Sequence, residues 1–210
     1  MKKGIVFLSF YFFAVSSFLY PQNSNVDNIT KFCKIIDSRI NEEEGLNNYY
    51  MVHTIVYESN VRAIGPQKTT IKFYYTQPYD SLVEKDETTE ILDVYKPPVK
   101  VLVEYNIAAS QNVKIKYYSN ENGELICCHY ITLGGYTNGE NYFYFENGKP
   151  KNIKFVCMDS QLKVLEQYKN YEKDSDFTKE ELKDCMQVVK KWSDYKKMFD
   201  QLIYIEKLDK

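Results

Sequence analysis

The sequence has few of the residue types on which most catalytic and metal sites depend. It contains only two histidines, His53 and His129, and a single tryptophan in 210 residues. It has no HExxH or CxxC motif, no acidic calcium loop, no GxSxG elbow and no glycine-rich phosphate loop. The sequence therefore contains none of the motifs typical of zinc enzymes, serine hydrolases or nucleotide-binding enzymes. We expect a protein that is not an enzyme and that holds no cofactor.

Arginine is also scarce, because Arg39 and Arg62 are the only two and every other basic residue is lysine. The formal net charge is −2, and no basic stripe exists that would neutralise phosphates. We therefore expect no nucleic-acid partner. The twenty tyrosines look prominent, but together with the lysine excess we interpret them as a compositional bias of the source genome. Their number alone is not a functional signal.

A long apolar run occurs only at the N-terminus, from Gly4 to Leu19, after Lys2 and Lys3 and before Pro21. This layout is typical of a secretory signal peptide. We assign it to residues 1–22, with cleavage anywhere between 16 and 25. A retained anchor is the alternative, although a membrane helix needs roughly 20 apolar residues.

Export predicts an extracytoplasmic protein, periplasmic or secreted, with no membrane span after cleavage. Losing Lys2 and Lys3 changes the formal net charge from −2 to −4. The remaining chain, 23–210, is long enough for one domain with its own core.

Five cysteines are present, so at least one has no partner within the chain. Cys127 and Cys128 are adjacent in an expected strand and would point to opposite faces. We expect buried thiols, with one disulfide as the alternative. Cys127 and His129 share a face, which suggests either a hydrolase pair or two zinc ligands needing a third such as Cys157. The simpler interpretation is a half-buried strand in which His129 finds a hydrogen bond.

Hydrophobic periodicity predicts an α+β fold with a helix at each end. The stretch "NVDNITKFCKIIDSRINEEEG" has apolar residues at helical spacing, and 177–208 reads as a long helix with a capping box at Thr178 and Glu181. Its expected buried stripe comprises Leu182, Cys185, Val189, Trp192, Phe199 and Leu202. The expected strands are 48–58, 69–77, 99–107, 112–119, 124–133, 140–146 and 151–158. They predict an antiparallel meander, open or bent into a half-barrel, with the C-terminal helix packed on it.

Two segments are less clear and one feature repeats. Residues 80–98 hold either a strand at 89–95 or a long loop, and 166–176 read as a polar break. The stretches "YYSNENGELI" (117–126) and "FYFENGKPKNI" (143–153) share an aromatic pair followed by Glu-Asn-Gly, and a weaker "YTNGEN" (136–141) lies between them. Because Asn-Gly suits tight turns, the repeat predicts recurring hairpins.

On these hairpins, the N-terminal signal and the C-terminal helix, the sequence resembles a loose group of uncharacterised exported bacterial proteins. The resemblance covers residues 112–210 best. It implies the fold and export, and it carries no assigned activity or site residues.

The stretch "NYFYFENGKPKNIKF" (141–155) offers a candidate surface. A two-residue turn at Asn147-Gly148 would place Glu146 opposite Lys149, Tyr144 opposite Lys151 and Tyr142 opposite Ile153, whereas a bulge would change the partners. Phe143 and Phe145 would face the core. Tyr142 and Tyr144 would face outward with Lys114 and Lys116, as a partner surface or as a face covered by a helix.

The leading hypothesis is a non-enzymatic binding or interaction module of the cell envelope or secreted space. Its site would be the face of Tyr142 and Tyr144 or a cleft between sheet and helix, and its partner an unknown envelope protein. The alternative is a carrier of a small apolar ligand, with the long helix closing a half-barrel cavity. A hydrolase built from carboxylates, or from Cys127 and His129, is a third hypothesis.

Overall fold

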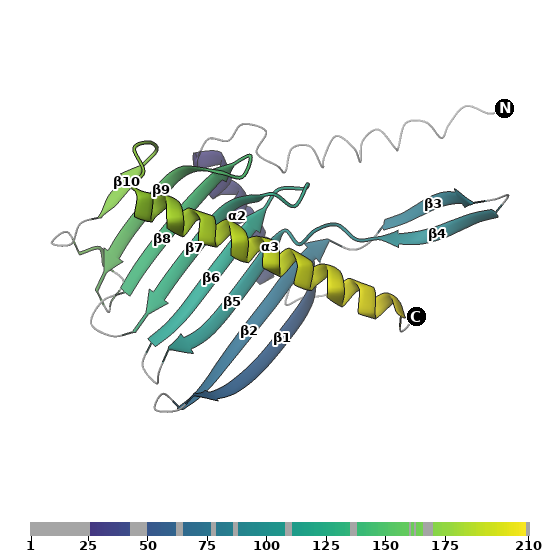
Figure 1. Ribbon diagram of the computed structural model, residues 1–210, viewed down its shortest axis with the longest axis horizontal. Coiled ribbons are helices and arrows are strands. Elements are labelled where there is room, and N and C mark those ends of the chain that lie inside the picture. Colours follow the sequence, from purple (N-terminus) through teal and green to yellow (C-terminus); the bar gives the residue numbers. More distant parts are fainter. Residues whose placement is uncertain are drawn as a thin grey trace.

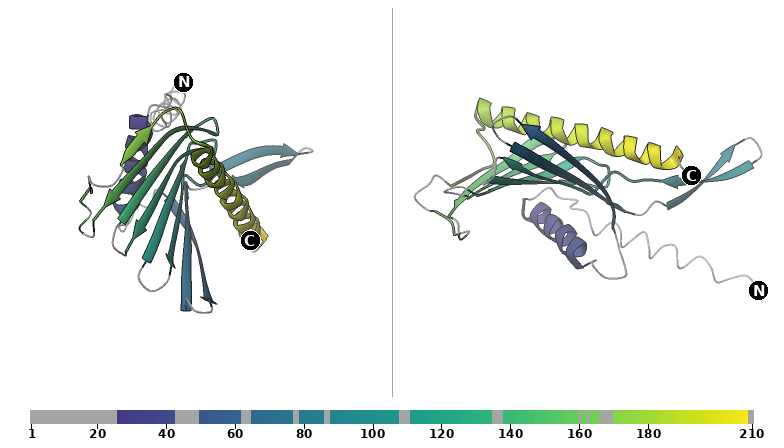
Figure 2. Two further views of the ribbon diagram at one scale, coloured as in Figure 1. Left: turned by 60° about the vertical axis from the view of Figure 1, so that its left-hand side comes forward. Right: turned by 90° about the horizontal axis from the view of Figure 1, so that it is seen from below.

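Two helices enclose an antiparallel sheet in the computed structural model, one helix on each face (Figure 2). Helix α2 (Val26–Glu42) covers one face, and helix α3 (Lys179–Leu208) crosses the other obliquely (Figure 1). The structure describes residues 26–42, 50–61, 65–76, 79–85, 88–107, 111–134, 138–159, 161, 163–165 and 170–208. The predicted signal segment 1–22 lies outside these residues.

The sheet is an open meander of eight strands, in the order β1-β2-β5-β6-β7-β8-β9-β10. Its strands are β1 (Tyr50–Val61), β2 (Gly65–Thr76), β5 (Lys100–Ile107), β6 (Gln111–Ser119), β7 (Leu125–Leu133), β8 (Asn138–Glu146), β9 (Lys149–Met158) and β10 (Tyr171–Lys173). Every neighbouring pair is antiparallel. The predicted α+β meander with a helix at each end is confirmed, and the sheet is not closed.

The segment 80–98, for which the sequence left a strand or a loop open, forms most of a separate hairpin. Strands β3 (Tyr79–Lys85) and β4 (Thr88–Val94) pair with each other and not with the main sheet, from which they project (Figure 1). The predicted strand at 89–95 corresponds to β4, and its partner β3 escaped prediction. The predicted polar break at 166–176 likewise contains β10, which pairs with β9.

Alternation along the strands builds two cores. The face beneath α3 packs strand residues such as Phe73, Val101 and Phe145 against the helix. The helix contributes four buried residues to this core, Cys185, Trp192, Phe199 and Ile203. The other face packs Leu102, Tyr118 and Tyr144 against the helix α2 residues Ile29, Phe32, Cys33 and Ile36.

The N-terminus of α3 has the predicted capping box. The Thr178 hydroxyl accepts the Glu181 amide at 3.2 Å, and the Glu181 carboxylate accepts the Thr178 amide at 2.7 Å. The predicted stripe needs correction at both ends, since Leu182 is exposed and Ile203 is buried more deeply than Leu202. At about 100° per residue, Leu182 and Leu202 lie roughly 80° to either side of the buried line.

The hairpin between β8 and β9 turns at Asn147-Gly148, as predicted. Both residues are left-handed, with φ of 52° and 73°, which is the geometry of a tight two-residue turn. Glu146 pairs with Lys149 as expected.

The predicted pairing of Phe145 with Pro150 is also confirmed, but beyond it the register expected for a turn without a bulge is wrong. A bulge follows Tyr144, so that Tyr144 pairs with Asn152 and Tyr142 with Lys154. Phe145 pairs with Pro150, which has no N–H to donate to the ladder. An irregularity at this point is the usual accommodation of a proline in a strand.

The earlier Asn-Gly pair forms a different turn. A five-residue connection links β6 and β7, and within it only Gly123 is left-handed, while the Asn120 side chain accepts the amides of Asn122 and Glu124. Gly123 is also closely packed, because a Cβ there would lie 2.7 Å from Pro97. The third pair, Asn138-Gly139, begins β8. The repeated Asn-Gly sequence therefore occurs near hairpins, as predicted, but the turn geometry differs from one copy to the next.

Replacing Gly148 by Ala should lower the free energy of unfolding by about 1 kcal/mol, because an L residue is strained at its positive φ. Gly139→Ala is the matched control. Gly139 lies in a strand without positive φ, and an added Cβ would make only ordinary contact with Phe155 at 3.9 Å. Urea denaturation of both variants tests the turn, and equal stabilities would contradict it.

Candidate functional site

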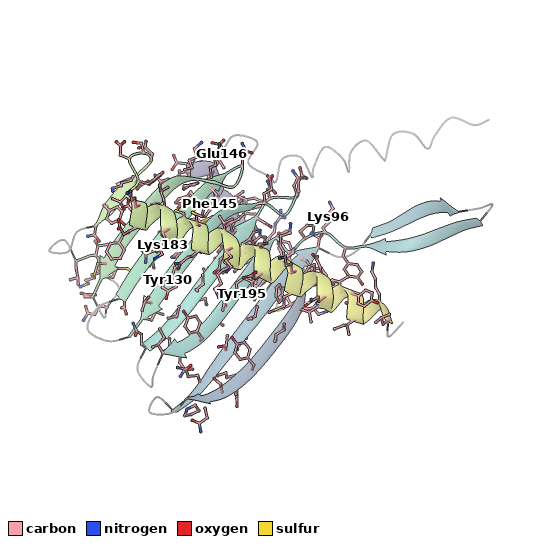
Figure 3. The ribbon with its side chains drawn as sticks, in the orientation of Figure 1. Lys96, Tyr130, Phe145, Glu146, Lys183 and Tyr195 are labelled. Atoms are coloured by element: carbon pink, nitrogen blue, oxygen red, sulfur yellow. The ribbon has the colours of Figure 1, made fainter. Side chains whose placement is uncertain are left out.

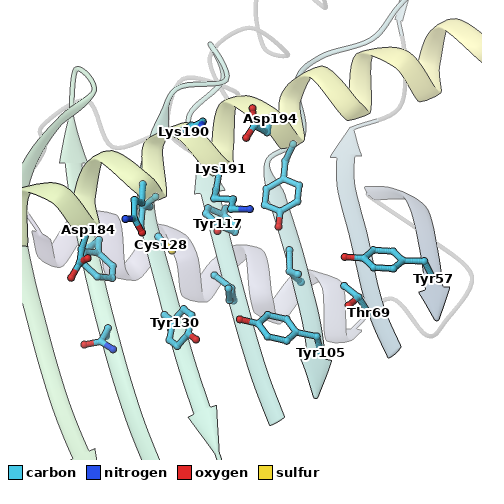
Figure 4. Close-up of a pocket in the computed structure, with 17 residues that line it drawn as sticks. Tyr57, Thr69, Tyr105, Tyr117, Cys128, Tyr130, Asp184, Lys190, Lys191 and Asp194 are labelled. Carbon is cyan, nitrogen blue, oxygen red and sulfur yellow. The ribbon is translucent and has the colours of Figure 1, made fainter. Parts of the chain in front are cut away.

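A cleft of about 800 Å³ lies between the sheet and the N-terminal half of α3 (Figure 4). Its sheet side comes from six strands and is rich in tyrosine, whereas its helix side is polar. The lining residues are Tyr57, Thr69, Val103, Tyr105, Ile115, Tyr117, Cys128, Tyr130, Asn141, Phe143, Asp184, Gln187, Val188, Lys190, Lys191, Asp194 and Tyr195.

Aromatic rings are distributed along the whole cleft. Tyr57, Tyr105 and Tyr130 project from β1, β5 and β7 below α3 (Figure 4). Tyr195 reaches the same space from the helix (Figure 3). Deeper inside, the Tyr117 ring lies 5.3 Å from the Tyr195 ring. A ligand lying along the cleft would contact tyrosine rings from several strands and from α3.

The only tryptophan holds α3 over this aromatic floor. Trp192 stacks on Tyr117 at 6.3 Å, and its indole N–H donates to the Gly123 carbonyl at 3.1 Å. Gly123 in turn lies against Pro97. These contacts of Trp192 set the distance between α3 and the sheet next to the cleft. The cleft is therefore preformed.

Burial favours the neutral forms of three phenols and of the thiol in the cleft. Burial raises the pKa of Tyr195 to about 12, and it also raises the pKa of Tyr117 above its ordinary value. The pKa of Tyr105 is raised by burial and by a hydrogen bond with Tyr130. Burial raises the pKa of the Cys128 thiol as well. These groups can donate hydrogen bonds but are poor nucleophiles and bases at neutral pH.

The helix side of the cleft carries balanced charge. Asp184, Lys191 and Asp194 are drawn on this side in Figure 4, where Lys190 completes two acidic and two basic groups. Gln187 adds an amide one turn after Asp184, and Asn141 adds another from β8. The cleft thus has one side of aromatic rings and one side of hydrogen-bonding groups. The hydrogen-bonding groups are either uncharged amides or acidic and basic side chains in equal number.

The other face of the sheet holds the two tyrosines predicted as a partner surface. Tyr144 lies beneath α2, where its hydroxyl and that of Thr30 share a hydrogen bond of 3.1 Å, and only 4% of the residue is exposed. Of the two alternatives for this face, a partner surface or cover by a helix, Tyr144 follows the second, because α2 covers it. That Tyr142 and Tyr144 form a partner surface stays a prediction, and only Tyr142 has appreciable exposure to support it.

Tyr142 itself belongs to a small polar cluster. Its hydroxyl donates to Glu140, which also bonds His129 Nε2 at 3.1 Å, and the Tyr142 and His129 rings stack at 4.0 Å. The hydrogen bond of His129 lowers the pKa of Glu140, against the opposing effect of burial. The predicted hydrogen bond of His129 in a half-buried strand is confirmed.

Cys127 and His129 do lie on one face, as predicted, but they have different partners. Cys127 is buried beneath α2 in the same cluster as Cys33, whereas His129 contacts Glu140 and Tyr142. Cys157 is buried as well. Within the described residues, no three His, Cys, Asp or Glu side chains form a group suited to a metal ion.

An acidic residue of α2 holds three further polar side chains on this face. Asp37 accepts from Lys100 at 2.6 Å, from Lys116 at 2.7 Å and from the Tyr118 hydroxyl at 2.8 Å. Burial alone would raise the pKa of Asp37, but the hydrogen bonds and charges of Lys100 and Lys116 lower it below its ordinary value. Lys116, expected to face solvent, instead holds α2 on the sheet.

No family model, curated protein or solved structure matches the chain. Among the helices that the structure describes, none is long and apolar enough to cross a membrane.

The tyrosines of the cleft escaped prediction as a group, because the abundance of tyrosine was interpreted as compositional. A signal was nevertheless present in the alternation. Tyr105 continues the apolar face of Val101 and Val103, and Tyr117 continues that of Val113 and Ile115.

Proposed function

We propose that the protein is an exported, non-enzymatic binding module whose site is the cleft between α3 and the sheet. The observation that supports this most strongly is the preformed cleft of about 800 Å³ with neutral phenols along it. A cavity of this size is within the range of small-molecule sites. Export to the periplasm or the exterior is part of the proposal and rests on the N-terminal sequence.

The chemistry of the cleft favours an uncharged ligand with both apolar faces and hydroxyl groups, such as an oligosaccharide. A sugar ring can lay its C–H face on Tyr105 or Tyr130 and direct its hydroxyls to Asn141, Gln187 or Asp184. The two acidic and two basic side chains of the helix side balance. They offer hydrogen bonds without selecting a charged molecule.

A purely apolar ligand, the alternative considered for this fold, fits less well. Filling the cleft with hydrocarbon would remove water from Asn141, Gln187 and the charged groups of α3 without replacing their hydrogen bonds. Each such loss costs on the order of 1–3 kcal/mol. The apolar carrier therefore remains the competing proposal and is tested alongside.

Binding can be followed through Trp192, the only tryptophan, because its ring stacks on Tyr117 at the floor of the cleft. We expect at least one neutral oligosaccharide in a panel of glucans, chitin fragments and mannans to change its fluorescence. Tyr130→Ala should weaken that binding roughly tenfold or more, as loss of a central aromatic contact does. Titration calorimetry then gives the affinities.

Tyr142→Ala is the matched control. Tyr142 pairs with His129, the residue before Tyr130 in β7, but its side chain lies on the α2 face. Binding should be unchanged in this variant. Binding lost in Tyr142→Ala and kept in Tyr130→Ala would move the site to the other face. A fatty acid that binds when no oligosaccharide does would establish the apolar carrier instead.

A further inference from the structure

The two adjacent cysteines of β7 each face a cysteine of the helix on their own side. Cys127 points toward α2 and belongs to the same buried cluster as Cys33. Cys128 points toward α3 and belongs to the same buried cluster as Cys185. All four side chains are buried, and all are free thiols in the structure. Both layers of the protein thus contain two thiols from different elements.

The position of Cys33 over Cys127 is fixed by hydrogen bonds on either side. Cys127 pairs with Tyr118 of β6 and with Tyr144 of β8, so these three side chains form one row across the sheet. Thr30 of α2 bonds the Tyr144 hydroxyl, and Asp37 bonds the Tyr118 hydroxyl.

Residues 30, 33 and 37 lie on one face of a helix, since they are spaced three and four apart. Helix α2 is therefore anchored to the row at both ends, and Cys33 falls between the anchors, above Cys127. In agreement with this geometry, the neighbouring Cys127 side chain adds to the effect of burial in raising the pKa of the Cys33 thiol. The Cys128 and Cys185 thiols share the core on the other face of the sheet.

We propose that Cys33 and Cys127 form a disulfide that joins α2 to β7 when the chain folds in the presence of a disulfide oxidant. One thiolate attacks a sulfur of the oxidant and releases the first oxidant thiol, leaving a mixed disulfide. The second thiolate then attacks the protein sulfur of that mixed disulfide and releases the second oxidant thiol. The two cysteines lose two protons and two electrons, and one disulfide of the oxidant becomes two thiols.

Oxidation should take place during folding and not in the finished protein. Burial raises the pKa of the Cys33 thiol well above its ordinary value, so the native state contains little of the reactive thiolate. Helix α2 also covers Cys127, which keeps an oxidant from the sulfur. Once formed, the bond would close a long loop and restrict the unfolded chain.

The test is to refold the reduced, full-length protein in a buffer of oxidised and reduced glutathione, and to block the remaining thiols. Digestion without reductant, followed by mass spectrometry, should give one peptide pair joined through Cys33 and Cys127 and three blocked cysteines. The Tm should be higher than that of the reduced protein by on the order of 10 °C. Native reduced protein placed in the same buffer should react much more slowly.

Cys33→Ala and Cys185→Ala form the matched pair of variants, one for each helix. The Tm difference between oxidised and reduced protein should vanish in Cys33→Ala and persist in Cys185→Ala. Because each variant is compared with its own reduced form, a general loss of stability does not affect the result. Five free thiols after refolding, or a bond between Cys128 and Cys185 in place of the proposed one, would overturn the proposal.

Discussion

Replacing Asp37 by Asn is expected to lower the free energy of unfolding by about 3 kcal/mol. The amide would keep the shape of the side chain but would leave the Lys100 ammonium without a counter-charge. Only 6% of the Lys100 side chain is exposed, and its Nζ lies 2.6 Å from Asp37. A buried cation that loses its partner keeps the cost of leaving water, which is why the expected effect is large. Urea denaturation at neutral pH measures it.

Two further variants make the interpretation specific. Glu104→Gln breaks the ion pair with Lys114, in which the charged atoms lie 2.9 Å apart and both side chains are about 40% exposed. This variant should lower the free energy of unfolding by less than about 1 kcal/mol. Adding Lys100→Met to Asp37→Asn removes the stranded charge and should recover part of the loss. A loss in Asp37→Asn no greater than that in Glu104→Gln would show that this cluster does not stabilise the fold.

The same cluster should make stability depend on pH. The pKa of Asp37 is lower in the folded protein than its ordinary value of 3.8, because Lys100 and Lys116 favour the carboxylate despite burial. Its contribution is therefore complete above that ordinary pKa and is lost as the pH falls through the folded one. As the pH falls from about 5 to about 2, the wild type should lose more stability than Asp37→Asn. Glu140 acts in the same direction in both proteins.

Replacing Phe199 by Ala should lower the free energy of unfolding by about 4 kcal/mol. Phe199 is 1% exposed, and its ring lies 5.8 Å from Phe73, 5.0 Å from Tyr75 and 6.4 Å from His53. These rings come from β1 and β2, so Phe199 fixes the C-terminal half of α3 on the sheet. Removing the ring leaves a cavity between rigid neighbours that cannot collapse into it.

Met186→Ala, in the same helix, is the control. Met186 is 73% exposed, and its truncation should change the free energy of unfolding by no more than about 0.5 kcal/mol. Phe199→Leu should fall between the two. A cost below about 1.5 kcal/mol for Phe199→Ala would mean that α3 is held mainly by the N-terminal contacts of Trp192.

The helices and the meander could be predicted because their signals are local. The capping box at Thr178 needs only four residues, and the alternation from Val101 to Tyr105 needs only one strand. Asn147-Gly148 likewise encodes its own turn. The register after it could not be derived in the same way, since the shift at Phe145 arises from Pro150 on the partner strand.

The burial of Tyr144 and the cleft depend on contacts between segments far apart in the chain. Whether Tyr144 faces solvent is decided by α2, more than a hundred residues earlier, through Thr30. The cleft likewise exists because α3 crosses the sheet at an angle, which leaves Tyr105 and Tyr130 partly uncovered. A single-strand pattern records which face a residue takes, but not how far a distant helix extends over that face.

The β3–β4 hairpin separates two strands that are neighbours in the sheet. Strand β2 pairs directly with β5, and the intervening hairpin pairs only with itself. On return, the Val99 amide donates to the Tyr74 carbonyl at 2.8 Å, so the register of β5 is set from β2. The meander would keep the same pairings whatever the length of the excursion. Residues 79–94 are therefore where evolution or an engineer can lengthen, shorten or exchange the chain without redesigning the rest.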